Sequence, residues 1–166
     1  MTFDSTPNGH FIPGTTPATQ PDHLKRQIEL SYVAGFTDGE AYVGFSKTQQ
    51  PGRKHPTYRL TFSFTQNNLG SLKRVARILG VPVRIYEVKR LTQHNRQIYT
   101  LAIGDKDAYD ALVLLLPYLD RKHVEATIAL EAYVACHLDK HPGCKGHAAE
   151  VWKLRERYYW KLRKLK

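Results

Sequence analysis

The sequence contains few cysteines and no long apolar segment. Cys136 and Cys144 are the only cysteines among its 166 residues, so a disulfide framework is excluded and a reducing compartment is expected. No apolar run approaches the roughly 20 residues that a membrane span requires, which predicts a protein without a membrane partner. The first 24 residues contain no Lys or Arg, whereas signal and transit peptides carry Lys or Arg near their start. We therefore expect an intracellular protein that is not secreted.

Acidic residues are almost missing from the middle of the chain. Between residues 41 and 104, eleven Lys or Arg residues stand against one carboxylate, that of Glu87. The resulting net charge of +10 equals the formal charge of the entire chain. Such a concentration of positive charge favours a polyanionic partner.

The first 23 residues lack any hydrophobic period. They are rich in Pro, Thr and Gly, a composition typical of a flexible arm. We expect residues 24–166 to form a single domain, because a chain of this length fits one hydrophobic core.

From Leu24 onward, periodic apolar residues predict an α+β domain. Leu24, Ile28 and Tyr32 recur every four residues, the spacing of an apolar helix face. Apolar and polar residues alternate over 41–48 and 57–66, which predicts two strands, each with one buried face. The pattern further predicts a turn at Pro51-Gly52, a helix over 69–79 ending at Gly80, strands over 83–90 and 96–103, a helix from Asp105 (as its N-cap) to about Pro117, a helix over 120–138 and a basic helix over 148–166. The chain is thus predicted to form a helix, two strands, a second helix, two more strands and further helices, which is an α+β order.

The outward faces of the four predicted strands are the candidate nucleic-acid interface. Arg and Lys neutralise phosphates, and short hydroxyl and amide side chains contact base edges in the major groove. A pair of antiparallel strands is narrow enough to enter that groove. The candidate DNA-binding residues are Ser46, Thr48, Arg59, Thr61, Ser63, Arg84, Tyr86, Arg96, Ile98 and Thr100. We therefore expect double-stranded DNA as the partner.

The segment Val33–Ala41 combines small and acidic residues where a helix is predicted. Its sequence, VAGFTDGEA, includes Gly35, although glycine inside a helix costs about 1 kcal/mol relative to alanine. The segment resembles the LAGLIDADG motif of homing endonucleases and aligns with it without a gap. Asp38 and Glu40 take the two acidic places of the motif. Glu40 stands where Asp is more usual in the family, and Ala41 stands where Gly is more usual.

Two further residues extend the resemblance over about residues 24–136. Gln66 ends the second predicted strand, and Lys122 follows the third predicted helix. Both positions match a Gln and a Lys of the family. The family's other basic active-site residue is expected early in the helix after Gln66, where Lys73 and Arg74 are the candidates.

The resemblance implies the αββαββα fold of LAGLIDADG homing endonucleases, with a four-stranded antiparallel DNA-binding sheet and C-terminal helices. It implies an endonuclease that uses Mg²⁺ or another divalent cation to make a double-strand break in a long, pseudo-palindromic DNA target. One motif in the chain resembles the homodimeric branch. Such an enzyme would act in the compartment of its host genome, a bacterial or phage cytoplasm or an organelle.

The resemblance also implies roles for individual residues. Asp38 is expected to cap and end the paired motif helices. The implied site residues are Glu40, Gln66 and Lys122 for catalysis, Glu40 and Gly39 for the metal, and Tyr32, Ala34, Gly35 and Asp38 for the dimer interface. Each subunit would cut one DNA strand.

Other functions stay open at the level of sequence. An intron RNA maturase or a non-cleaving, sequence-specific DNA-binding protein would share the scaffold, and RNA would be a partner only in the first case. The Glu87-Val88-Lys89 triplet resembles half of a different nuclease core, but no Asp lies between Asp38 and Asp105 to complete it.

Two features near the C-terminus have alternative interpretations. Cys136, His141, Cys144 and His147 form a conceivable zinc cluster, although their spacing fits no common zinc finger. The basic, aromatic C-terminal segment has a composition that membrane-surface helices share. Packing of its aromatic side chains on the core is the favoured interpretation.

Overall fold

The computed structural model of the protein describes residues 22–88, 96–138 and 147–165. The predicted N-terminal arm therefore lies almost entirely outside the described residues. The first helix begins at Asp22, two residues before the predicted start of the domain.

The observed order of elements confirms the α+β prediction. In chain order they are α1 (Asp22–Glu40), β1 (Ala41–Thr48), β2 (Thr57–Gln66), α2 (Leu69–Leu79), β3 (Ile85–Val88), β4 (Ile98–Gly104), α3 (Asp105–Leu115), a 3₁₀ turn (Leu116–Tyr118), α4 (His123–Ala135) and α5 (Ala149–Arg163). The predicted helix end near Pro117 is this 3₁₀ turn, because proline lacks the N–H that would continue the α-helix.

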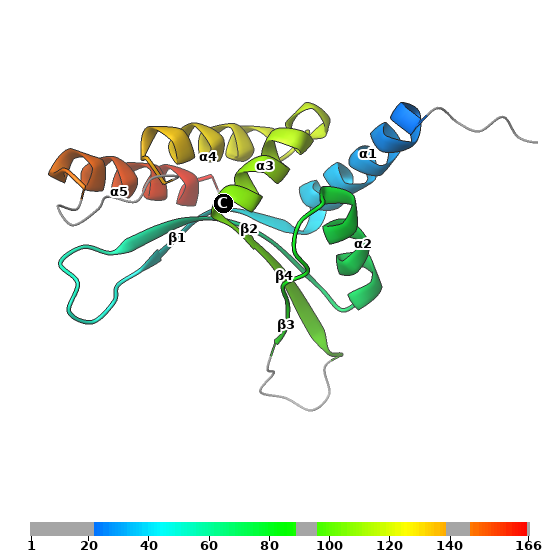
Figure 1. Ribbon diagram of the computed structural model, residues 1–166, viewed down its shortest axis with the longest axis horizontal. Coiled ribbons are helices and arrows are strands. Elements are labelled where there is room, and N and C mark those ends of the chain that lie inside the picture. Colours follow the sequence, from blue (N-terminus) through cyan, green and yellow to red (C-terminus); the bar gives the residue numbers. More distant parts are fainter. Residues whose placement is uncertain (1–21, 89–95, 139–146, 166) are drawn as a thin grey trace, which may run out of the picture.

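The four strands form one antiparallel sheet in the order β1-β2-β4-β3. Helices α3, α4 and α5 cover one face of the sheet, and the opposite face is open (Figure 1). The register pairs Val43 with Phe62 and Phe64 with Leu101, so apolar side chains of neighbouring strands share the covered face. Phe62, Phe64 and Leu101 are completely buried there. The two-residue period thus gives the sheet a core side and an open side.

Helix α1 has apolar side chains on two opposite faces. Its buried face consists of Leu30, Val33, Ala34 and Thr37. The predicted period of Leu24, Ile28 and Tyr32 is confirmed as helical, but these side chains lie at the surface, 37%, 52% and 37% exposed. A helical period shows which residues share a face, whereas the packing of the other elements decides which face is covered.

Of the two residues predicted to lie at helix ends, Gly80 is confirmed and Asp105 is not. Gly80 ends α2 as predicted, in the left-handed conformation (φ 68°), and its N–H donates to the carbonyls of Ala76 and Arg77. The prediction of Asp105 as an N-cap is wrong, because Gly104 holds that position and Asp105 is the first residue of α3. Asp105 has a φ of 51°, and its carboxylate lies beside Arg59 instead.

The C-terminal helix α5 is fastened to the β1–β2 hairpin. The Glu156 carboxylate accepts hydrogen bonds from Lys47, Tyr58 and Trp160. Trp152 lies near Tyr58, with ring centroids 6.5 Å apart. The favoured interpretation of the aromatic C-terminal segment is confirmed for Trp152, Tyr158 and Tyr159, which pack against the core. Among the helices of the described residues, none has the length and apolar character needed to cross a bilayer.

Candidate active site and nucleic-acid interface

The motif residues Val33 to Glu40 form the last two turns of α1. The helix continues through Gly39 to Glu40, and the chain enters β1 directly at Ala41. Gly39 and Glu40 are both exposed. The last carbonyl groups of a helix have no intrahelical donor, so the Gly39 carbonyl and the Glu40 carboxylate provide two kinds of oxygen ligand at one place.

Gln66 lies at the end of β2, which the sheet register places beside the end of α1. The antiparallel pairing of Ala41 with Phe64 brings the end of β2 beside the end of α1. Gln66 pairs with Tyr99 of β4, and its side-chain oxygen accepts a hydrogen bond from the N–H of Asn67 at 3.2 Å. The side-chain amide is therefore anchored at the end of a strand rather than in a loop.

Asp38 connects the motif to Lys122. Its carboxylate accepts hydrogen bonds from the backbone N–H groups of Lys122 at 2.8 Å and Asp120 at 3.0 Å. These N–H groups precede α4 and have no partner within a helix, so Asp38 caps the start of α4 within its own chain. The Arg121 guanidinium donates to the Asp38 carbonyl at 3.3 Å. The motif thereby positions Lys122 next to the end of α1.

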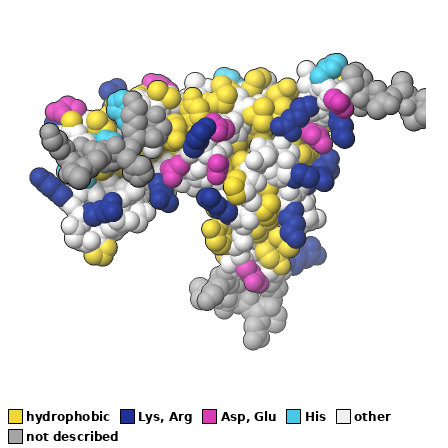
Figure 2. Space-filling view, in the orientation of Figure 1, with side chains coloured by type: hydrophobic (Ala, Val, Ile, Leu, Met, Phe, Trp, Pro, Cys, Tyr) yellow, Lys and Arg dark blue, Asp and Glu magenta, His cyan; other side chains and the backbone are white. Residues whose placement is uncertain are grey.

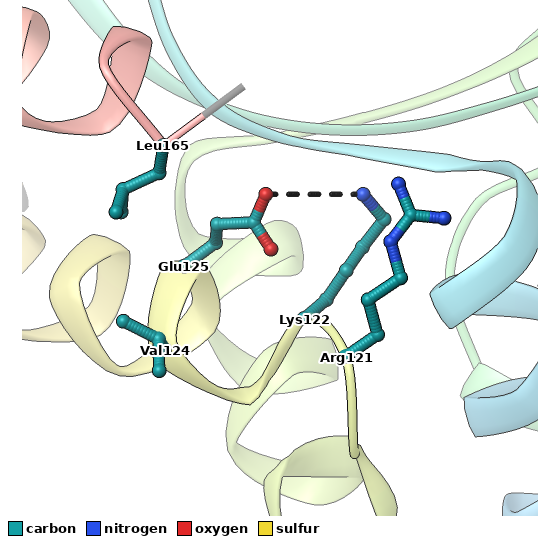
Figure 3. Close-up of a pocket in the computed structure, with 5 residues that line it drawn as sticks. All are labelled: Arg121, Lys122, Val124, Glu125 and Leu165. Carbon is teal, nitrogen blue, oxygen red and sulfur yellow. Dashed lines mark ion pairs between the residues drawn. The ribbon is translucent and has the colours of Figure 1, made fainter.

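Lys122 and Arg121 line a pocket of about 460 Å³ together with Val124, Glu125 and Leu165. Both basic side chains point toward the ribbon of α1 and β1 (Figure 3). The Lys122 ammonium lies 4.0 Å from the Glu125 carboxylate, and the two side chains are only 12% and 13% exposed. The opposite charges attract each other at this distance, and their low exposure limits the screening of that attraction by solvent.

Sequence reasoning missed Arg121 and Glu125. The available signal was the spacing of three residues between Lys122 and Glu125 at the start of a helix, which brings the two side chains together. Arg121 could have been suspected only because it neighbours Lys122.

The two candidates for a further basic residue occupy the exposed side of α2. The Arg74 guanidinium lies 4.3 Å from the centre of the Tyr32 ring, a distance at which cation and ring attract each other. Arg74 is therefore held at the exposed face of α1, whereas Lys73 is an exposed side chain of α2.

The end of α1 suits a Mg²⁺ ion that is held by few protein ligands. Within the described ranges, no three His, Cys, Asp or Glu side chains are close enough to enclose a metal ion. Mg²⁺ is usually bound by one or two carboxylates, and waters and substrate phosphates complete its coordination. Glu40 and the Gly39 carbonyl match this open type of site in the chemistry of their oxygen atoms.

The open face of the sheet carries most of the predicted DNA-binding residues. The register pairs Ser46 with Arg59, Thr61 with Gly104 and Tyr86 with Thr100. By the alternation of the strands, the side chains of Ser46, Thr48, Arg59, Thr61, Ser63, Tyr86, Ile98 and Thr100 share this face. Arg84 and Arg96 lie just before β3 and β4. Lys and Arg side chains also gather along the projecting part of the molecule that α2 and the β3–β4 hairpin form (Figure 2).

The described residues do not assemble the two minor alternative sites. The His147 ring nitrogen lies 3.0 Å from the Arg155 guanidinium, and burial together with this cation lowers the pKa of His147. Burial raises the pKa of the Cys136 thiol to about 11, which opposes the thiolate that zinc requires. His141 and Cys144 lie outside the described residues. So does Lys89, the basic member of the triplet around exposed Glu87.

Comparisons with known proteins identify the fold. No family model matches the sequence, and no curated protein matches it. The homing endonuclease I-CvuI, in complex with the I-CreI target, matches 86% of this chain and 85% of its own, with a TM-score of 0.68 and 20% identity. The archaeal intron-encoded homing endonuclease I-Vdi141I, complexed with DNA, matches 88% of this chain and 86% of its own, with a TM-score of 0.64 and 17% identity.

A third similar structure is the LAGLIDADG homing endonuclease I-GzeII in complex with its DNA target. It matches 81% of this chain and 43% of its own, with a TM-score of 0.59 and 14% identity. The chain therefore has the LAGLIDADG homing endonuclease fold, as its motif and element order predict.

Proposed function

We propose that this chain, which has the LAGLIDADG homing endonuclease fold, is a site-specific DNA endonuclease that acts as a homodimer with a divalent cation. The observation that carries the proposal is the hydrogen bond from the Lys122 N–H to Asp38, two residues before Glu40 at the end of α1. Gln66 ends β2, two residues beyond the pairing of Phe64 with Ala41, and the same strands form the open, basic face. A carboxylate, an amide and an enclosed ammonium are suited to the hydrolysis of a phosphodiester. Two structures of the similar protein I-CvuI with DNA were determined in the presence of Mg or Ca.

Each residue of the site has a distinct proposed role. Glu40 and the Gly39 carbonyl would hold the cation, for which Mg²⁺ is the proposed identity. A bound Mg²⁺ lowers the pKa of a water molecule and stabilises charge on a leaving oxygen. The Lys122 ammonium stabilises negative charge that develops on the phosphate, and Glu125 keeps that ammonium in position. The Gln66 amide, fixed at the end of β2, orients a water molecule.

Features of the exposed face of α1 support a homodimer. Leu24, Ile28, Tyr32, Gly35 and Gly39 lie along one line on this face. A Cβ atom added at Gly35 or Gly39 would meet no described atom within 4 Å, so nothing within the described monomer requires the absence of a side chain there. Close approach of a second helix is a reason for glycine at such positions.

The position of the other predicted interface residues refines this proposal. Ala34 is completely buried within its own chain, and Asp38 binds the backbone before α4. Tyr32 and Gly35 are therefore the predicted interface residues with open surfaces. A symmetric contact through them would place one Glu40 of each subunit near the two-fold axis.

We expect Gly35→Leu to separate the dimer. Overpacking costs about 1–3 kcal/mol, and two-fold symmetry imposes the cost from both subunits. The variant should sediment as a monomer and lose cleavage, while each monomer stays folded because the position is open within the chain. Lys153→Leu, on the exposed side of α5, is the control and should remain a dimer. A Gly35→Leu protein that stays dimeric and still cuts DNA would contradict this interface.

We expect arginines of the open face to be required for target recognition. Replacing Arg59, Arg84 and Arg96 singly by Ala should cost about 1–3 kcal/mol where the side chain contacts a base, with relaxed preference at one position per half-site. Loss of a phosphate contact should weaken binding to all sequences alike. Titration of duplexes at several salt concentrations measures both effects. Arg157→Ala, on α5, is the control, and unchanged binding in all three variants would exclude the sheet as the DNA surface.

The proposed activity is tested with a randomised duplex library. Purified protein is incubated with the library in Mg²⁺ or in a chelator, and the cut ends are sequenced. We expect Mg²⁺-dependent double-strand breaks within one long sequence with approximate two-fold symmetry. Binding without any cut ends would favour a non-cleaving DNA-binding protein, and preferential binding to structured RNA would favour a maturase.

A further inference from the structure

A shallow depression of about 260 Å³ lies on the open face of the sheet. Its lining includes Arg59, Arg84, Thr61 and Tyr86, residues that the proposed function assigns to DNA binding. The lining also includes Asp105, a carboxylate beside two arginines, Arg59 and Arg84. A carboxylate here repels phosphates, so its presence calls for a reason other than general DNA affinity.

The backbone directs the Asp105 side chain into this depression. Asp105 lies where β4 ends and α3 begins, with a φ of 51°, a left-handed conformation that Asp adopts more readily than most residues. The backbone N–H of Leu60 donates a hydrogen bond to the Asp105 carboxylate. The carboxylate thus continues the contact between β2 and β4 beyond Gly104, the last β4 residue paired with β2.

The Asp105 carboxylate forms an ion pair with Arg59. The Arg59 Nε atom lies 3.6 Å from the carboxylate oxygen, and the two side chains are 68% and 42% exposed. An exposed ion pair contributes little to stability. Its consequence is geometric, because a guanidinium whose Nε faces a carboxylate still presents both terminal nitrogens. These two nitrogens match the O6 and N7 acceptors of guanine in the major groove.

We infer that Asp105 is a positioning residue that holds Arg59 for the recognition of one guanine in each half of the DNA target. Without Asp105, the long Arg59 side chain would be free to turn toward neighbouring phosphates, a contact that carries no sequence information. Asp105 thereby lowers the affinity for DNA of any sequence and raises the preference for one base. This inference rests on the proposed DNA-binding function and adds a residue and a base to it.

The test compares base preference in binding selections from a randomised duplex library. The proteins are the unmodified chain, Arg59→Ala, Arg59→Lys and Asp105→Asn. Asn also tolerates a positive φ, and its side-chain oxygen can still accept from Leu60, so this variant removes the charge and keeps the turn. Arg59→Lys keeps the charge, removes the two-nitrogen fork and leaves the turn untouched. Asp110→Asn is the control, because it removes another exposed ion pair, with Lys106, on the same helix.

We expect the unmodified protein and the control to prefer guanine at one position per half-site. Arg59→Ala and Arg59→Lys should lose this preference, and Asp105→Asn should reduce it about tenfold at the same position. Binding of Asp105→Asn to unrelated duplexes should be equal or tighter, since a negative charge is removed. Melting temperatures check that the variants are folded.

The outcomes separate the inference from the function on which it rests. An unchanged guanine preference in a folded Asp105→Asn protein would overturn the positioning role. An unchanged preference in Arg59→Lys would overturn the recognition of guanine by the guanidinium, whether or not Asp105→Asn folds. Both results would leave DNA binding established. An unmodified chain that binds no duplex would contradict the proposed function itself.

Discussion

Replacing Glu40 by Gln is expected to abolish DNA cleavage and to leave DNA binding equal or tighter. Glu40 is the proposed metal ligand at the end of α1, where its side chain is exposed. Gln keeps the size of the side chain but removes the charge that a hard cation requires. The same charge repels DNA phosphates and the second Glu40 of a dimer when no cation is bound. The gain in binding should therefore be clearest in the absence of Mg²⁺.

The measurement combines DNA binding in a chelator with single-turnover cleavage in Mg²⁺. Glu29→Gln is a matched control, since it removes a carboxylate from the same helix, where Glu29 lies 3.9 Å from Arg26. The control should bind and cut like the unmodified protein. A Glu40→Gln protein that cleaves at the native rate would end the endonuclease assignment in this form. The maturase or the non-cleaving DNA-binding protein would then become the leading interpretation.

Replacing Lys122 by Met should slow cleavage by about 10²–10³-fold, the loss typical of a single charge-stabilising donor. DNA binding should weaken slightly, because one positive charge near phosphates is removed. The sign of the binding change is therefore opposite to that expected for Glu40→Gln, while the effect on cleavage has the same direction. Lys106→Met, on the exposed side of α3, is the control for a lost surface charge.

A lower cleavage rate in Lys122→Met has a structural explanation that must be separated from catalysis. The substitution leaves the enclosed Glu125 carboxylate without its cation, which destabilises the fold. The double variant Lys122→Met/Glu125→Gln removes both charges. We expect it to recover thermal stability and not cleavage. Recovery of cleavage in the double variant would show that Lys122 acts through folding alone.

Local sequence patterns were sufficient for the elements of this fold. The alternation over 41–48 and 57–66 predicts two strands with one apolar face, and both strands occur with that face on the core. Gly80 is predicted and observed at the end of α2, because only a residue tolerant of positive φ ends a helix in this way. Such features depend on residues close in the chain, so the sequence carries them directly.

Side-chain partners from distant segments were decided only by the tertiary structure. Asp38 is 84 residues from Lys122, whose backbone N–H it binds, and Asp105 faces Arg59 instead of capping its own helix. The apolar period that begins at Leu24 describes a helix face correctly, yet that face is open in the monomer. By itself the sequence determined the helices, the strands, the acidic motif and the concentration of positive charge. The packing of the helices on the sheet decided which groups meet at the end of α1, because periodicity defines faces within a segment and only the packed chain defines what lies against them.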